Sequence, residues 1–175
     1  MKFALLFTLV LICGLGLASA ESINVSNYNV VFNMSQKHEV TMPQSEMFRN
    51  GTGVRETNEI SINTSNGFVV MAVGISNFTN QQSMAEAFET LSTTMGAEGG
   101  AFPRSIDIDN KNGWYAVYYI NHIPTYAIMY YIHAPPGTDY YTTPNGATAF
   151  GLILSTMSLY DTVDFLRSLH TRSRT

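Results

Sequence analysis

Two segments repeat apolar residues at helical spacing and predict amphipathic helices. The first runs from Ser83 to Met95, and a capping box of Ser83 and Glu86 marks its start. Gly96 follows it, where the end of a helix favours a left-handed residue. The apolar stripe of this helix consists of Met84, Phe88, Leu91 and Met95.

The second predicted helix runs from Ser158 to about His170. Ser158 and Asp161 suit its N-terminus, and Arg167 and His170 suit the negative end of the helix dipole. The pattern predicts one apolar face made of Leu159, Val163 and Leu166, with Phe165 and Leu169 beside it.

Most of the remaining chain has the short, β-prone runs that predict strands. Asn-Gly signals near Thr64–Gly67 and Asn110–Gly113 predict two hairpins, and a turn containing Pro124 predicts a third. Hairpin connections favour an antiparallel sheet with the helices packed on it, so we expect an α+β fold and an α-β-α sandwich. The predicted strands are 28–34, 59–63, 68–75, 105–109, 114–120, 125–133 and 147–156.

The N-terminus predicts an export signal. One positive charge at Lys2, an apolar run over residues 3–17 and the small residues Ala18, Ser19 and Ala20 are its three parts. Cleavage after Ala20 leaves a single α+β domain of residues 21–175. The alternative is that residues 3–20 stay uncleaved as a membrane anchor, because this run is just long enough to cross a bilayer. The predicted location is therefore extracytoplasmic in both cases.

Charge and cysteine content narrow the chemistry of the mature domain. The whole chain has a net charge of −4, and removal of Lys2 makes it one unit more negative, which argues against nucleic acid as a partner. The single cysteine, Cys13, lies within the predicted signal. We therefore expect no disulfide, no thiolate nucleophile and no cysteine-bound metal in the mature domain.

The order of elements gives a resemblance to known folds. Strands, a helix, more strands and a final helix preceded by the run Gly151-Leu152-Ile153-Leu154-Ser155 resemble the PsbP/Mog1-like α-β-α sandwich domains. The export signal and the terminal helix are similar to small exported archaeal proteins of unassigned role. The resemblance spans residues 22–170. It implies an accessory or scaffold role and transfers no catalytic residue.

Five glycosylation sequons lie in the first half of the chain. Glycans at surface turns of that half are one interpretation, and a polar, asparagine-rich composition is the other. The sequon asparagines are Asn24, Asn33, Asn50, Asn63 and Asn77.

Signals for metal, cofactor and catalytic sites are weak. The run Asp107–Gly113 departs from a calcium loop, because Lys111 stands where an oxygen ligand is needed, and it fits a polar hairpin turn better. The chain has no nucleophile elbow and no phosphate-binding loop of the Walker type. Four histidines lack metal-ligand spacing, and we expect ordinary structural roles for His38, His122, His133 and His170. We therefore predict no catalytic residue, metal or cofactor.

Aromatic residues are the least ordinary feature of the sequence. Eight of the ten tyrosines lie between Tyr115 and Tyr141. Cross-strand aromatic packing is a sufficient reason for them, and a platform for a partner is the functional alternative. In that alternative, the candidate binding residues are Trp114, Tyr118, Tyr131, Tyr140 and Tyr141.

These features predict an exported module that acts by binding or assembly, with an envelope protein or a glycan as partner. One alternative is an exported hydrolase with a site such as His133 beside a carboxylate from another strand. The other is a structural envelope component, which scattered rather than contiguous outward tyrosines would favour.

Overall fold

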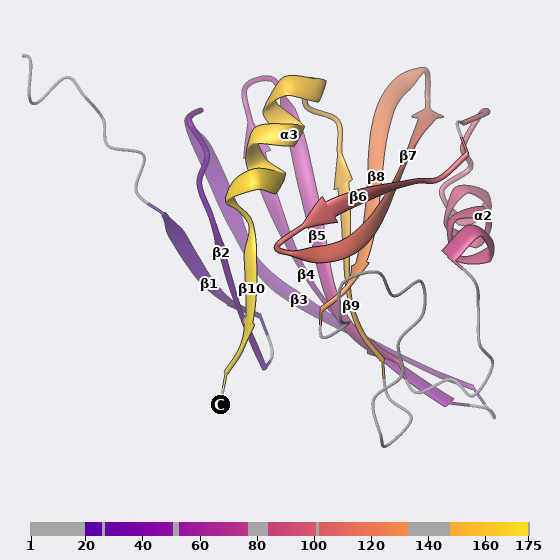
Figure 1. Ribbon diagram of the computed structural model, residues 1–175, viewed down its shortest axis with the longest axis horizontal. Helices are drawn as coiled ribbons and strands as arrows, with labels where there is room; N and C mark the ends of the chain where they lie inside the picture. Colours follow the sequence, from indigo (N-terminus) through magenta and orange to yellow (C-terminus); the bar gives the residue numbers. More distant parts are fainter. Residues whose placement is uncertain are drawn as a thin grey trace, which may run out of the picture.

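The computed structural model describes residues 20–25, 27–50, 53–76, 84–100, 102–132 and 148–174. These residues form a mainly antiparallel α+β structure with two helices, as the sequence predicts (Figure 1). In chain order the elements are β1 (Glu21–Val25), β2 (Tyr28–Phe32), β3 (His38–Asn50), β4 (Gly53–Thr64), β5 (Gly67–Ser76), α2 (Met84–Thr94), β6 (Arg104–Ile108), β7 (Lys111–Ile120), β8 (Ile123–Tyr131), β9 (Thr148–Ser155), α3 (Leu159–Ser168) and β10 (His170–Ser173).

The strands belong to two sheets. The large sheet has the order β3-β4-β5-β9-β8-β7-β6, and the small sheet has the order β1-β2-β10. Every strand pair in both sheets is antiparallel. β9 pairs with both β5 and β8, so it joins the hairpin of the first half of the chain to the hairpins of the second half.

Helices α2 and α3 lie against opposite faces of the large sheet. Along β8, Ile128 and Tyr130 belong to the core cluster that contains Phe165 of α3, whereas Ala127 and Tyr131 belong to the cluster that contains Phe88 of α2. This alternation follows from the two-residue period of a strand. It explains why the β7–β8 region is apolar on both faces.

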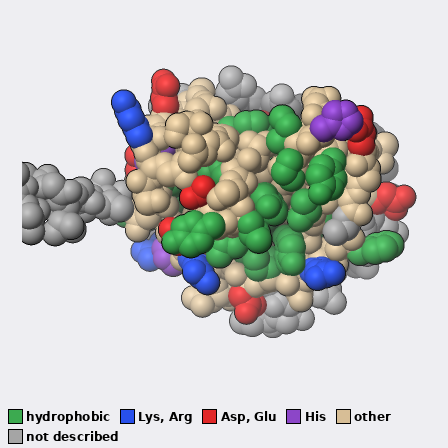
Figure 2. All heavy atoms as spheres, turned by 90° about the horizontal axis from the view of Figure 1, so that it is seen from above, with side chains coloured by type: hydrophobic (Ala, Val, Ile, Leu, Met, Phe, Trp, Pro, Cys, Tyr) green, Lys and Arg blue, Asp and Glu red, His purple; other side chains and the backbone are tan. Residues whose placement is uncertain are grey.

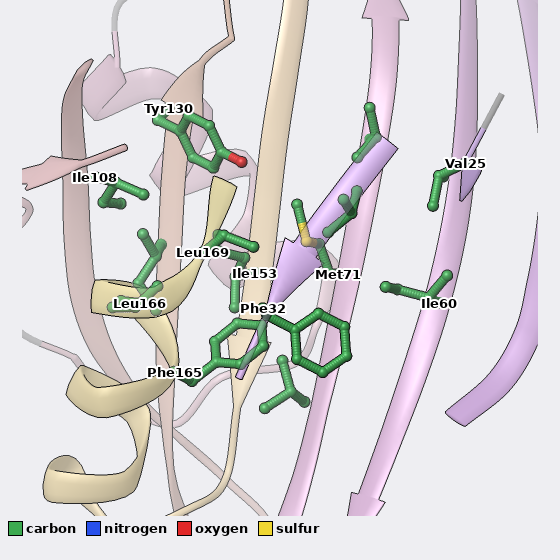
Figure 3. Packing of buried hydrophobic residues seen from close by; sticks show 14 of the residues in the cluster. Val25, Phe32, Ile60, Met71, Ile108, Tyr130, Ile153, Phe165, Leu166 and Leu169 are labelled. Carbon is green, nitrogen blue, oxygen red and sulfur yellow. The ribbon is translucent and has the colours of Figure 1, made fainter. Parts of the chain in front are cut away.

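The small sheet shares the face that α3 covers. Phe32 of β2 and Phe165 of α3 pack with their ring centroids 5.4 Å apart, and both are fully buried (Figure 3). Val25 and Val30 reach the same cluster from β1 and β2, and Ile60 reaches it from β4. The main core is therefore closed from one side by the small sheet and α3 together.

Two tight hairpin turns use residues in the left-handed region. Asp109 and Asn110 connect β6 to β7 with φ of 52° and 59°, and Asn121 and His122 connect β7 to β8 with φ of 51° and 64°. Two central residues with positive φ match the right-handed twist of the flanking strands. The predicted turn at Asn110–Gly113 is misplaced, because β7 begins at Lys111, three residues before the predicted strand.

Gly113 lies inside β7 rather than in a turn, and close packing explains why. A Cβ atom at this position would come within 2.9 Å of the Ile108 side chain and 3.2 Å of the Met129 carbonyl oxygen. Pro124 likewise lies in β8, opposite Tyr119, and not in the turn before it. The turns are made instead by the pairs that come earlier in the chain, Asp109–Asn110 before β7 and Asn121–His122 before β8.

The two helices agree with the sequence pattern except at the ends of α3, and Ser83 of the predicted capping box lies outside the described residues. Gly96 has the expected left-handed φ of 63° after α2. Ser158 caps α3 by accepting a hydrogen bond from the Asp161 backbone N–H at 3.1 Å. The helix ends at Ser168, however, and His170 begins strand β10. Leu159 was expected on the apolar face but is exposed, whereas Thr162 is buried with Phe165 and Leu166.

Strands β1 and β10 are not predicted by the sequence pattern. Both are short edge strands that pair only with β2 among the described strands. β3 (His38–Asn50) is also absent from the predicted strands. No helix in the described part of the chain is long and apolar enough to cross a membrane.

Candidate functional site

Three of the predicted aromatic binding residues pack beneath α2. Tyr118 and Tyr131 are buried, and the half-buried Trp114 meets Tyr131 edge to face with ring centroids 6.3 Å apart. The Tyr118 hydroxyl donates a hydrogen bond of 3.1 Å to the backbone oxygen of Phe88. This contact ties α2 to β7, so these rings hold the helix on the sheet. The other two candidates, Tyr140 and Tyr141, lie outside the described residues, as does His133.

Other apolar side chains form an exposed surface at one end of the large sheet. Tyr119 and Ile123 flank the β7–β8 turn and are 48% and 51% exposed. Leu159 and Tyr160 begin α3 and are 58% and 76% exposed. Figure 2 shows apolar side chains gathered across this end of the molecule, with most charged side chains at the margin. We call these four residues the apolar end surface.

Strand register explains how the apolar end surface continues onto the sheet. Tyr119 lies opposite Pro124, and Val117 lies opposite Tyr126, so these side chains share one face of the β7–β8 hairpin. Tyr126 packs against the core cluster that includes α3, which identifies the face. Val117 and Tyr126 are only half-buried. This part of the sheet face is therefore apolar but incompletely covered.

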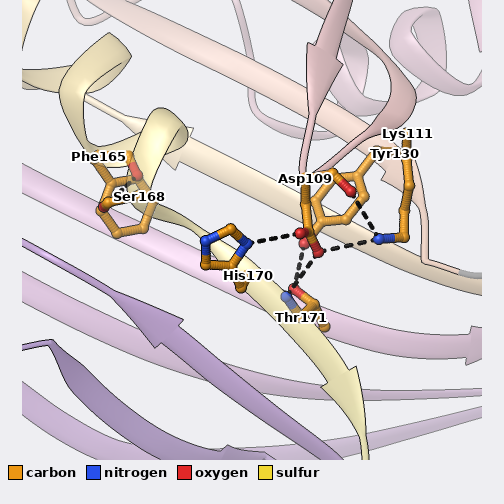
Figure 4. Close-up of polar contacts among 7 residues, drawn as sticks. All are labelled: Asp109, Lys111, Tyr130, Phe165, Ser168, His170 and Thr171. Carbon is orange, nitrogen blue, oxygen red and sulfur yellow. Dashed lines mark hydrogen bonds and ion pairs between the residues drawn. The ribbon is translucent and has the colours of Figure 1, made fainter.

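A polar cluster around Asp109 lies at the junction of the two sheets (Figure 4). Its Oδ1 accepts a hydrogen bond from His170 Nδ1 at 2.8 Å, and its Oδ2 accepts one from the Thr171 backbone N–H at 2.9 Å. Lys111 Nζ lies 3.0 Å from both Oδ2 and the backbone oxygen of Asp109. Next to it, the hydroxyls of Tyr130 and Thr171 form a buried hydrogen bond of 2.7 Å.

The cluster changes the acidity of two of its members. Burial alone would raise the pKa of Asp109. Hydrogen bonds from the Thr171 backbone and from His170 lower this pKa, and so do the hydrogen bond and the positive charge of Lys111. The lowering is larger, so the pKa lies below the ordinary 3.8. Burial raises the pKa of Tyr130 far above its usual range, and the hydrogen bond with Thr171 only partly offsets this. Asp109 is therefore a carboxylate and Tyr130 a neutral phenol at neutral pH.

The hydrogen bonds of the Asp109 cluster orient the side chains within it and connect separate parts of the fold. The cluster links the β6–β7 turn of the large sheet to β10 of the small sheet. At the opposite edge of the small sheet, Glu21 Oε1 of β1 lies 2.8 Å from His38 Nε2 of β3. A histidine–carboxylate pair therefore joins each edge strand of the small sheet to the large sheet. In the described part of the chain no hydrogen bond joins a histidine to a hydroxyl, as an activated nucleophile would require.

These histidine pairs could not be predicted from the sequence, because their members are far apart in the chain. His170 and Asp109 are separated by 61 positions, and His38 and Glu21 by 17. A third pair, His122 and Glu98 at 3.3 Å, is exposed to solvent by 90% and 61%. Screening leaves such an exposed pair with little effect on stability. No spacing rule within one element could have indicated any of the three.

The sequon asparagines are distributed over several elements. Asn24 lies in β1, Asn33 directly follows β2 and Asn63 lies near the end of β4, and all three are exposed. Asn50 ends β3, and Asn77 lies outside the described residues. Asn24 and Asn63 therefore lie within strands rather than at turns. Glycosylation stays a prediction for all five.

Comparison with known proteins does not assign the chain to a family. No family model, curated protein or solved structure matches it. Within the described ranges, no group of three or more histidine, cysteine, aspartate or glutamate side chains is arranged to hold a metal ion. The resemblance to PsbP/Mog1-like domains therefore stays a prediction. Function has to be argued from the surfaces and clusters described above.

Proposed function

We propose that this protein is an exported module that acts by binding or assembly and not by catalysis. The observation that carries the proposal is the apolar end surface, where four large apolar side chains are about half exposed or more. Contiguous apolar surface of this kind on a small protein is typical of an interaction site. Figure 2 shows apolar side chains gathered over this end of the molecule, which favours binding over a purely structural role.

The partner that fits the apolar end surface is another protein of the cell envelope. Tyr119 and Tyr160 each offer an apolar ring with a polar tip, which is the residue type enriched at protein interfaces. Ile123 and Leu159 add exposed aliphatic surface. Charged residues stay at the margin, as expected for an interface with an apolar centre and a polar rim.

The predicted export signal fits the same proposal. β1 begins at Glu21, the residue that cleavage after Ala20 would make the new N-terminus. Such a cut would leave every described strand and helix intact. The α-β-α sandwich is proposed on similar grounds, since α2 and α3 cover opposite faces of the large sheet, with the small sheet added beside α3.

Paired substitutions test the role of the apolar end surface. Ile123→Ser together with Tyr160→Ser removes two exposed apolar groups whose loss leaves the buried core unchanged. We expect this variant to lose crosslinking to its envelope partner in native envelopes while keeping its unfolding midpoint. Phe68→Ser is the matched control, because Phe68 is similarly exposed but points to the opposite face of the large sheet from its core neighbour Val69. Equal crosslinking by the double variant and the wild type would contradict the proposed function.

A further inference from the structure

A polar groove lies between the C-terminal half of α3 and the end of β2. It has a volume of about 520 Å³, and Val31 adds an apolar patch to its wall; Ala20 also lines it but would leave the chain with a cleaved signal. Sites for small ligands generally have volumes of 300–1,000 Å³ and combine apolar surface with a few converging polar groups. The polar residues lining it are Asn33, Ser35, Asp164, Arg167, Ser168 and His170.

The groove is built on fixed side chains. His170 donates from Nδ1 to the mostly buried carboxylate of Asp109, which holds the ring in one orientation and leaves Nε2 as the free ring nitrogen (Figure 4). The Ser168 hydroxyl accepts a hydrogen bond from the backbone N–H of Asn33, and its single proton can be donated to the backbone oxygen of either Asn33 at 3.0 Å or Phe165 at 2.9 Å. These bonds fix the backbone of Asn33, while its side-chain amide remains exposed at the groove.

The charges of the groove favour an uncharged ligand. Asp164 and Arg167 both line it, and neither forms an ion pair with another described residue. Because these two charges offset each other, the groove as a whole gives little electrostatic attraction to a simple anion or to a simple cation. The negative C-terminal end of α3 opposes an anion further. Carboxylate, guanidinium, amide, hydroxyl and imidazole groups instead supply both hydrogen-bond donors and acceptors.

A second observation lies in a recess that continues the groove. The recess shares Asn33, Ser35 and Asp164 with the groove, is also lined by Gln36 and has a volume of about 10 Å³. Gln36 Oε1 is buried and is the only such side-chain atom in the described residues without a hydrogen-bond partner. A recess of this size holds about one water or one hydroxyl group. A buried acceptor without a donor costs stability, so a hydroxyl in the recess would be stabilising once a small shift of the Gln36 side chain brought Oε1 to it.

From this geometry we propose that the groove binds a neutral carbohydrate. The vicinal hydroxyls of a sugar meet Asp164, Arg167 and the free Nε2 of His170, and its CH groups meet Val31. A hydroxyl or hydroxymethyl group of the sugar enters the recess that Gln36 lines. This site is separate from the apolar end surface, and the carbohydrate proposal does not depend on the proposed function.

Disaccharide titrations test the site. The probes are maltose, cellobiose and N,N′-diacetylchitobiose, added up to about 20 mM, a concentration that detects millimolar affinity. The readout is the imidazole NMR signals of His170, with calorimetry on the same samples. Because Asn33 is also a sequon asparagine, the full chain is produced without glycosylation, so that no attached glycan occupies the groove. Arg167→Ala and Asp164→Ala remove groove residues, and Arg104→Ala and Asp107→Ala are matched controls on exposed positions of β6.

The proposal predicts a saturable shift of the His170 signals by at least one disaccharide. Affinity should fall at least tenfold in both groove variants and stay unchanged in both controls. No shift with any of the three probes would overturn it. Acetate or phosphate binding more tightly than every disaccharide would also overturn it, because the groove would then be an anion site.

Discussion

Asp109 and Thr171, which lie 62 positions apart, are joined by a hydrogen bond of 2.9 Å from the Thr171 backbone N–H to Asp109 Oδ2. Thr171 belongs to β10, an edge strand of the small sheet. Its N–H is therefore satisfied by a side chain of the large sheet and not by a further strand. The bond protects this position of the edge from pairing with another chain, and it closes the core between the two sheets.

Removing the Asp109 carboxylate should destabilise the protein strongly. Asp109→Ala leaves the Thr171 N–H without its acceptor and Lys111 without its counter-charge, in a place where the carboxylate is only 11% exposed. We expect a loss of about 2–4 kcal/mol in the free energy of unfolding, measured by urea denaturation. Asp107→Ala, at an exposed position of β6, is the control and should change stability by less than about 0.5 kcal/mol. Equal losses in the two variants would show that the cluster does not stabilise the fold.

The free energy of unfolding should depend on pH in the acid range because of Asp109. Its pKa in the folded protein is below the ordinary 3.8, so its stabilising effect is complete above that value and disappears as the pH falls through the lowered pKa. We expect the free energy of unfolding of the wild type to fall below about pH 4 more steeply than that of Asp109→Asn. Denaturation curves at a series of pH values compare the two proteins. Parallel curves down to pH 2 would contradict the assignment.

Gly151 should be intolerant of a side chain because of Tyr130. The two residues are cross-strand partners, and a Cβ atom at Gly151 would lie 2.5 Å from the Tyr130 ring. Gly151→Ala should cost about 1–3 kcal/mol, since Tyr130 would have to move and strain its bond with Thr171. The same substitution in a Tyr130→Leu background should cost much less. A thermodynamic cycle of the two changes measures this coupling, and additive losses would rule it out.

The hydroxyl of Tyr118 should stabilise α2 on the sheet. Tyr118→Phe removes the hydrogen bond to the Phe88 backbone oxygen and should cost about 1 kcal/mol. Hydrogen exchange should become faster in α2 and stay unchanged in β5 and β9, because the contact is local. Tyr119→Phe is the neighbouring control, since its side chain is on the other face and half exposed. Unchanged exchange in α2 would mean that the apolar contacts alone hold the helix.

The sequence by itself determined the elements whose patterns are local. The stripe of α2, the left-handed Gly96, the Ser158 cap of α3 and the alternating strands all follow from neighbouring residues, so the antiparallel α+β class could be predicted. Short edge strands such as β1 and β10 could not, because their stability comes from pairing with β2 and not from their own pattern. The exact turns also escaped prediction, since packing at Gly113 placed that residue inside β7.

Only the tertiary structure decided which chemical groups meet. Sequence could indicate that tyrosines are concentrated in the β7–β8 region, but burial beneath α2 separated Tyr118 and Tyr131 from the exposed Tyr119. Adjacent residues of a strand point to opposite faces, and the sequence does not say which face is covered. The pairing of Asp109 with His170, and of Glu21 with His38, depends on how the two sheets pack. Contacts between distant segments carry no local signal, because they are set by packing of the whole core.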